Sequence, residues 1–164
     1  MKFKITLLIS VLVGLVFLDQ LTKFLITDHL IYGQVIEIIP SYFNLTYAKN
    51  PGAAFGIFSK IEDSFRVPFF ILMPLIALLL IGFVYFQSAN RLQQTSLALV
   101  MAGATGNLID RIRFGYVVDF LDFHWQHKGH FPSFNVADSA ITIGVTLLFI
   151  EMFFNKSSAE RVRK

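Results

Sequence analysis

Residues 5–26 read ITLLISVLVGLVFLDQLTKFLI, an apolar run long enough to cross a lipid bilayer as a helix. A hydrocarbon core of about 30 Å requires about 20 residues, because each helical residue adds about 1.5 Å. The whole chain is 55% hydrophobic and only 15% charged, with a mean hydropathy of +0.63. Soluble domains carry roughly 25% charged residues. We therefore expect an integral membrane protein.

Three more apolar stretches of similar length follow the first one. They predict an all-α membrane protein with four transmembrane helices in one domain, residues 1–164, with spans at roughly 5–26, 67–86, 94–112 and 136–154. An even number of crossings places both termini on one side of the membrane. Basic residues flank the outermost spans and predict cytoplasmic ends: Lys2, Lys4, Lys156, Arg161, Arg163 and Lys164. Residues 28–66 and 113–134 would then lie on the outer, periplasmic face.

The first outer segment predicts a small β-rich cradle. Residues 34–39 and 42–47 are rich in β-branched and aromatic side chains, and they bracket Pro40 and Ser41. We expect these two stretches to form a small sheet that rests on the membrane surface.

Polar side chains lie inside two of the predicted spans, where ionisable groups are costly and usually functional. Asp19 and Lys23 are four residues apart and share one helix face, as do Asn107 and Arg111. An ion pair at a helix end is the alternative for the first pair. Hydrogen bonding between helices is the alternative for the second.

The sequence NPGAAFG at residues 50–56 combines turn-forming and small residues. Asn50 and Gly52 would let the backbone approach another group closely. An ordinary tight turn needs the same residues, so this segment indicates a site only together with other polar groups.

Two aspartates flank the second outer segment. Asp119 follows the third predicted span and Asp138 lies in the first turn of the fourth, so the topology places both on the outer side. A capping role for Asp138 is the alternative, since Asn135 is a good N-cap residue three positions earlier. Two carboxylates a few ångströms apart would share a proton, giving one general base for water and one general acid for the leaving amine. Such a pair hydrolyses peptides without a nucleophilic side chain.

Five blocks together resemble the ordered signature blocks of the lipoprotein signal peptidases, or type II signal peptidases. They are DQLTK at 19–23, NPGAAF at 50–55, GNLIDR at 106–111, VVDF at 117–120 and FNVADS at 134–139. The resemblance implies a four-helix aspartic endopeptidase of the bacterial inner membrane, with its active site at the periplasmic face. Its substrates would be prolipoproteins bearing a diacylglyceryl-cysteine, and cleavage would occur immediately before this cysteine.

Residue matching to this family implies that Asp119 and Asp138 are catalytic. The supporting or substrate-binding residues it implies are Asp19, Lys23, Asn50, Gly52, Asn107, Arg111 and Asn135. Prolipoproteins and membrane lipids would be the partners. We expect no metal, no other cofactor and no nucleic-acid partner, and nothing in the sequence requires more than a monomer.

Two other classes of protein are the alternatives. Three histidines near Asp122 would suit a zinc-dependent membrane hydrolase, although Gly129 and Pro132 argue against one helix presenting all of them: His124, His127 and His130. A small proton-coupled transporter would need a relay of acids at several depths, drawn from Asp19, Asp110, Asp119 and Asp138. The chain has no cysteine, which excludes disulfides and thiolate nucleophiles.

Overall fold

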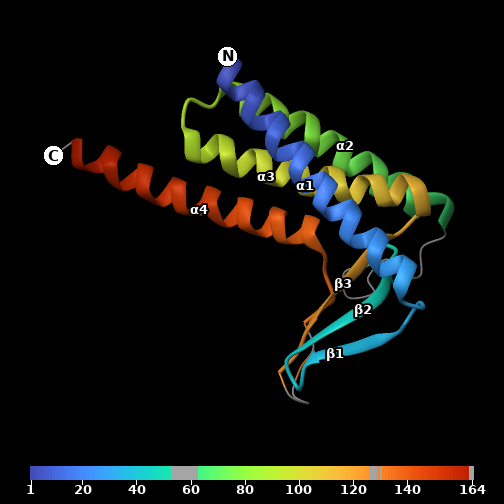
Figure 1. Ribbon diagram of the computed structural model, residues 1–164. Helices are drawn as coiled ribbons and strands as arrows, with labels where there is room; N and C mark the ends of the chain where they lie inside the picture. The colour runs from blue at the N-terminus through green and yellow to red at the C-terminus, as the bar shows by residue number, and fades with distance from the viewer. Residues whose placement is uncertain (53–62, 126–128, 130, 163–164) are drawn as a thin grey trace.

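The fold consists of four long helices with a small sheet at one end of them (Figure 1). The computed structural model describes residues 1–52, 63–125, 129 and 131–162. Its helices are α1 (Lys2–His29), α2 (Asp63–Gln87), α3 (Arg91–Phe114) and α4 (Val136–Val162). Each predicted span therefore coincides with a helix, and each helix extends beyond the span except at the start of α4.

Three of these helices are long and apolar enough to cross a membrane among the residues described: α1, α2 from Ser64 and α4 as far as Phe153. Helix α3 is long enough but more polar, and its buried face carries Gln94, Asn107 and Asp110. It packs against α1, α2 and α4, so neighbouring helices rather than lipid cover much of its surface. Polar side chains are tolerated inside a helix bundle because they find partners there.

The sheet is antiparallel, with strand order β1 (Val35–Ile39), β2 (Phe43–Asn50) and β3 (Val117–Phe123). The first two strands confirm the small sheet predicted for residues 34–39 and 42–47. The third strand was not predicted, and it lies in the segment that follows α3. Its side chains Val118 and Phe120 pack with Ile26 of α1 in a small core, which attaches the sheet to the helices.

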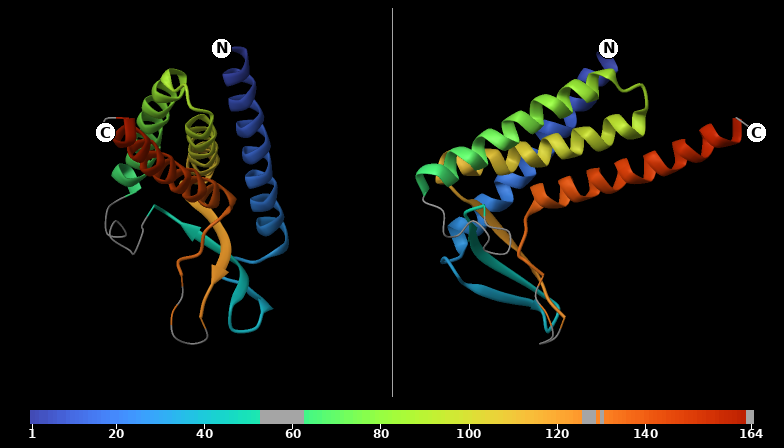
Figure 2. Two further views of the ribbon diagram at one scale, coloured as in Figure 1. Left: turned by 90° about the vertical axis from the view of Figure 1, so that its left-hand side faces the viewer. Right: turned by 180° about the vertical axis from the view of Figure 1, so that it is seen from behind.

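The sheet and the chain termini lie at opposite ends of the helices. In both views of Figure 2, α1 begins and α4 ends away from the strands. This arrangement agrees with termini on one side of a membrane and the sheet on the other.

Close packing of α3 against α4 depends on small residues. A Cβ atom on Gly144 would lie 2.6 Å from the backbone oxygen of Ser96, and one on Gly103 would lie 2.3 Å from the backbone oxygen of Ala137. Both neighbours are backbone atoms, which cannot rotate away. The two helices could not approach this closely with larger residues at these positions.

We predict that Gly144→Ala lowers the free energy of unfolding by about 1–3 kcal/mol, because the added methyl group forces the helices apart. The matched control is Gly14→Ala in α1, where a Cβ atom would meet nothing within 4 Å. That substitution should be neutral or stabilise the protein by up to about 1 kcal/mol, because alanine favours helix. Thermal unfolding in detergent measures both variants. Equal melting temperatures for Gly144→Ala and the wild type would contradict this packing.

Candidate active site

Asp119 and Asp138 reach the same place from two different elements. Helix α3 ends at Gly115, whose left-handed φ of 75° turns the chain into β3, where Asp119 lies. The chain then returns along β3, and the backbone of Phe134 pairs with that of Leu121. This pairing places the start of α4, and with it Asp138, beside β3.

Asn135 contacts both carboxylates. Its side-chain Nδ2 donates a hydrogen bond to Asp119 Oδ1 at 2.7 Å, and its backbone N–H donates to Asp138 Oδ2 at 3.3 Å. Its Oδ1 accepts from the backbone N–H of Asp138 at 2.9 Å. Asn135 therefore acts as the expected N-cap of α4 and at the same time connects the two acids. It has no exposed surface, so its orientation is fixed by these partners.

A second amide binds each carboxylate from the other side. Asn50, at the end of β2, donates from Nδ2 to Asp119 Oδ2 at 3.0 Å. Asn107 of α3 donates from Nδ2 to Asp138 Oδ1 at 2.7 Å. Each acid thus accepts hydrogen bonds on both oxygens, an arrangement that holds the carboxylates in fixed positions.

The turn after β2 orients Asn50. The backbone N–H of Gly52 donates to Asn50 Oδ1 at 3.0 Å, which leaves the amide nitrogen free to face Asp119. Gly52 has a φ of 97°, and a Cβ atom there would lie 2.5 Å from the ring of Phe70. Glycine is therefore required by both the backbone conformation and the approach of α2. Residues 53–56 of this predicted block lie outside the described residues.

Lys23 lies at the centre of a buried ion cluster behind the two acids. Its Nζ is 2.9 Å from Asp19 Oδ2, 2.9 Å from Asp110 Oδ2 and 3.0 Å from Asn107 Oδ1. Because Asn107 Oδ1 accepts from Lys23, its amide nitrogen must face the other way, towards Asp138. The expected ion pair between Asp19 and Lys23 is therefore present, but Lys23 is only 3% exposed and does not extend to the surface as it would in a pair at a helix end.

Asp19 also holds the start of α4. Its Oδ1 accepts a hydrogen bond from the backbone N–H of Ala137 at 2.9 Å, which satisfies one of the free donors at the helix N-terminus. A Cβ atom on Gly106 would lie 2.6 Å from Asp19 Oδ2. Glycine at that position therefore allows the carboxylate to pass between α1 and α3.

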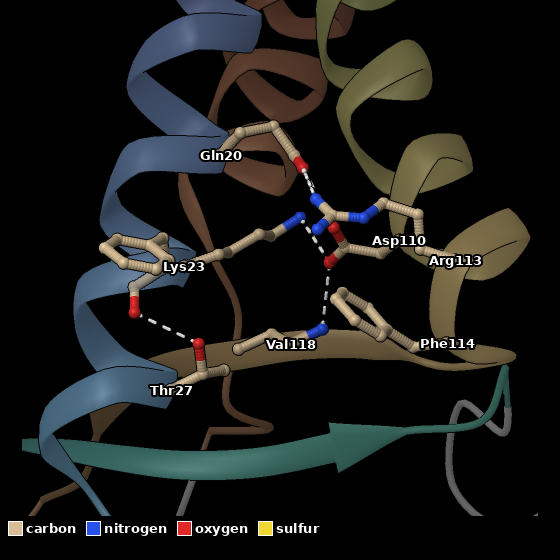
Figure 3. A pocket seen from close by; sticks show the side chains of 8 residues that line it. Gln20, Lys23, Thr27, Asp110, Arg113, Phe114 and Val118 are labelled. Carbon is tan, nitrogen blue, oxygen red and sulfur yellow. Dashed lines mark hydrogen bonds and ion pairs between the residues drawn. The ribbon is translucent and has the colours of Figure 1, made fainter.

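Asp110 and Gln20 belong to the cluster, although the sequence analysis gave neither a role in the peptidase site. Asp110 Oδ2 accepts from the backbone N–H of Val118 at 3.1 Å, and its Oδ1 accepts from Gln20 at 2.9 Å. Figure 3 shows these side chains around a cavity of about 50 Å³ that Arg113 also lines. Gln20 lies in the block DQLTK and Asp110 in the block GNLIDR, so membership of these blocks was the sequence signal that could have assigned them to the site. Asp110 fixes the strand segment just before Asp119.

Arg111 interacts with the two acids through charge, whereas the asparagines bind them through hydrogen bonds. Its guanidinium lies 5.6 Å from the ring centroid of Phe70 and interacts electrostatically with Asp138 and Asp119. Its Nε is buried and has no hydrogen-bond partner within the described part of the chain. An arginine with an unused donor at such a place can bind a carbonyl oxygen of a ligand.

The environment of Asp119 favours its protonated form. Burial, followed by the negative charge of Asp138, raises the pKa of Asp119 to about 7. Hydrogen bonds from Asn50 and Asn135 act in the opposite direction, but they do not compensate. Asp119 therefore titrates close to neutral pH, well above the usual range of an aspartate.

Asp138 is the more accessible acid and faces an open groove of about 530 Å³. The groove runs between the start of α4 and the chain that leads into it, and its walls include Asn50, Phe134 and Ile143. A volume of this size accommodates an extended peptide segment rather than a single water molecule. The groove is where a substrate can reach the acids.

The histidine alternative falls partly outside the structure, because His127 and His130 are not among the described residues. The backbone N–H of His124 pairs with Tyr42, and Asp122 accepts a hydrogen bond from Asn44 at 2.9 Å. Within the described ranges, no group of three His, Asp or Glu side chains could hold a metal ion.

Comparison with known proteins identifies similar chains over almost the whole length. Residues 11–154 match the family described as signal peptidase (SPase) II. The lipoprotein signal peptidase of Syntrophotalea carbinolica is 47% identical over 91% of both chains, and that of Geobacter metallireducens is 45% identical over 82% of this chain and 83% of its own. A solved bacterial membrane enzyme has a TM-score of 0.81 and 36% identity, covering 92% of this chain and 90% of its own. These matches confirm the resemblance that the five blocks predicted.

We predict that Lys23→Met lowers the free energy of unfolding by about 3–5 kcal/mol, because it leaves two buried carboxylates without their shared cation. The double variant Lys23→Met/Asp110→Asn should recover part of this loss. The exposed pair of His29 with Asp28 at 3.5 Å is the control, and Asp28→Asn should leave the melting temperature almost unchanged. If Lys23→Met and Asp28→Asn have similar melting temperatures, the cluster does not hold the site together.

Proposed function

Because this chain belongs to the signal peptidase II family, whose members are aspartic proteases, we propose that it removes signal peptides from prolipoproteins. The substrate would carry diacylglycerol on a cysteine, and cleavage would occur immediately before this residue. The observation that carries the proposal is that Asn135 hydrogen-bonds both Asp119 and Asp138 beside an open groove.

In this proposal Asp119 and Asp138 form a catalytic pair that shares one proton. The ionised member removes a proton from water, and the water oxygen attacks the scissile carbonyl carbon. The protonated member then supplies a proton to the leaving amine. The two acids titrate as a unit, so the roles of base and acid belong to the pair.

The surrounding residues would position the pair and the substrate. Asn50, Asn107 and Asn135 hold the carboxylates through hydrogen bonds of 3.0, 2.7 and 2.7 Å. Arg111, with its unused Nε, would bind a carbonyl oxygen of the peptide backbone. Asp19 and Lys23 would position the pair indirectly. Asp19 binds the backbone at the start of α4, and Lys23 orients the side chain of Asn107.

We propose a single domain that crosses the bacterial inner membrane four times, with α3 as the fourth crossing. Both termini would be cytoplasmic, and the sheet and the acid pair would lie at the periplasmic face. The burial of α3 among the other three helices supports this arrangement. A substrate anchored by its lipid in the outer leaflet would then present its scissile bond at the level of the groove. The proposal requires neither a cofactor nor a second copy of the chain.

The positions of the acids weigh against a proton-coupled transporter. Asp19 and Asp110 share Lys23, and Asp119 and Asp138 share Asn135. Asn107 contacts both Lys23 and Asp138, so all four acids lie in one connected cluster. A proton relay across a membrane needs groups at several depths.

We predict that Asp119→Asn and Asp138→Asn each reduce cleavage of a diacylglyceryl-modified prolipoprotein by about a hundredfold or more, because each removes one proton-transfer group. The matched control is Asp122→Asn, three residues along β3, which should retain cleavage. The assay follows the size shift of the substrate with purified protein in detergent, with and without a chelator. Cleavage that survives either substitution at the pair would exclude the aspartic mechanism, and loss in chelator would favour a metal hydrolase.

We further predict that kcat/KM falls as the pH rises through about 7, because Asp119, whose pKa is about 7, then loses the shared proton. The hydrogen bond from Asn50 lowers the pKa of Asp119, so Asn50→Ala should move this decline to higher pH. Each profile is compared with its own maximum, which separates the pKa effect from any loss of substrate binding. An alkaline limb that stays in place in Asn50→Ala would show that another group is titrating.

A further inference from the structure

Lys49 lies among three tyrosines at the sheet end of the helices. Its Nζ is 4.9 Å from the ring centroid of Tyr32, 5.7 Å from that of Tyr47 and 5.0 Å from that of Tyr116. The three rings come from the segment after α1, from β2 and from the segment before β3. Contacts of this kind attract a cation electrostatically and hold its position.

Arg113 continues the same pattern along the surface. Its Cζ lies 4.9 Å from the ring centroid of Phe114, and this ring stacks on Tyr116 with centroids 5.7 Å apart. Cations and rings therefore alternate from α3 to β2. We call this surface the basic–aromatic belt, and it consists of Tyr32, Tyr47, Lys49, Arg113, Phe114 and Tyr116.

The two cations of the belt, Lys49 and Arg113, form no ion pairs with the part of the chain that the structure describes. The nearby buried acid Asp110 pairs with Lys23 instead. Arg113 makes one long hydrogen bond, from Nη1 to Gln20 Oε1 at 3.5 Å, which Figure 3 shows. Most donors of its guanidinium remain for a ligand.

In the proposed membrane arrangement, the belt would lie at the headgroup level of the bilayer. Helix α1 exposes apolar side chains along its length, including Phe17 and Phe24, and Tyr32 of the belt follows the C-terminal end of this helix. Phe24 also lines the cavity beside Arg113 and Phe114. Aromatic rings and cations at the end of a lipid-facing surface are typical of the membrane interface.

We propose that the basic–aromatic belt binds the headgroup of an anionic phospholipid in the leaflet on the side of the sheet. The arginine fork suits phosphate oxygens, and the lysine held by the tyrosines supplies a second positive charge on the same belt. The acyl chains would lie against the apolar face of α1. This site lies apart from the groove at Asp138, and the inference does not depend on the peptidase reaction.

The test offers the protein in detergent equal amounts of phosphatidylglycerol and phosphatidylcholine with the same acyl chains. Native mass spectrometry measures which lipid remains bound. Each cation near a headgroup should contribute roughly fivefold, so Lys49→Gln/Arg113→Gln should reduce the preference for phosphatidylglycerol by about 30-fold. The charge-conserving variant Lys49→Arg/Arg113→Lys should stay within a few-fold of the wild type.

An unchanged preference in the double glutamine variant would overturn the proposal, as would its loss in the charge-conserving variant. Melting temperatures of all variants show whether they are folded. Inorganic phosphate added at matched ionic strength should not displace the lipid, and displacement would identify a site for soluble anions instead. Cleavage is measured in parallel, so that failure of lipid binding is distinguished from failure of the peptidase assignment.

Discussion

The buried ammonium group of Lys23 is the interaction on which the site depends. It joins Asp19 of α1 to Asp110 of α3 and binds the side-chain oxygen of Asn107. Burying a lone charge here would cost much free energy, and burying two carboxylates without a cation would cost more. Each charged group is therefore stable in this position only with its partners. The cluster therefore fixes α1 against α3 beside the acid pair Asp119 and Asp138.

Hydrogen bonds connect this ion cluster to the two elements that carry the acid pair. Asp19 holds the backbone at the start of α4, and Asp110 holds the backbone of β3 at Val118. These are the two elements that carry Asp138 and Asp119. Carboxylates that would repel each other in a flexible chain are thus kept together, and burial followed by the charge of Asp138 raises the pKa of Asp119 to about 7. The ion cluster holds the two elements on which this arrangement of the acids depends.

Much of this architecture could be predicted from the sequence, because its signals are local. Apolar runs predicted all four helices, and β-branched stretches predicted β1 and β2. Strand β3 was not predicted, because its sequence VVDFLDF is short and its partner β2 lies about seventy residues earlier in the chain. Pairing at that distance has no local signature.

For the candidate site, the sequence likewise indicated which residues take part but not the contacts between residues that are distant in the chain. Residue matching to the family assigned Asp119, Asp138 and the asparagines to one site, and the structure shows hydrogen bonds between them, which the matching did not indicate. Asp110 received no role in the peptidase site because an acid near a helix end has several common explanations, and only the contact with Lys23 distinguishes them. The double contact of Asn135 likewise depends on the return of the chain along β3.

An infrared titration of the protein between about pH 5 and 9 tests most directly whether the buried acid pair shares one proton near neutrality. Protonated carboxyl groups absorb separately from carboxylates, so the spectrum counts the proton without requiring a substrate. The account predicts one protonated carboxyl that disappears at about pH 7 in the wild type and is missing from this transition in Asp119→Asn. A spectrum without a protonated carboxyl near neutral pH, or one identical in the variant, would contradict it.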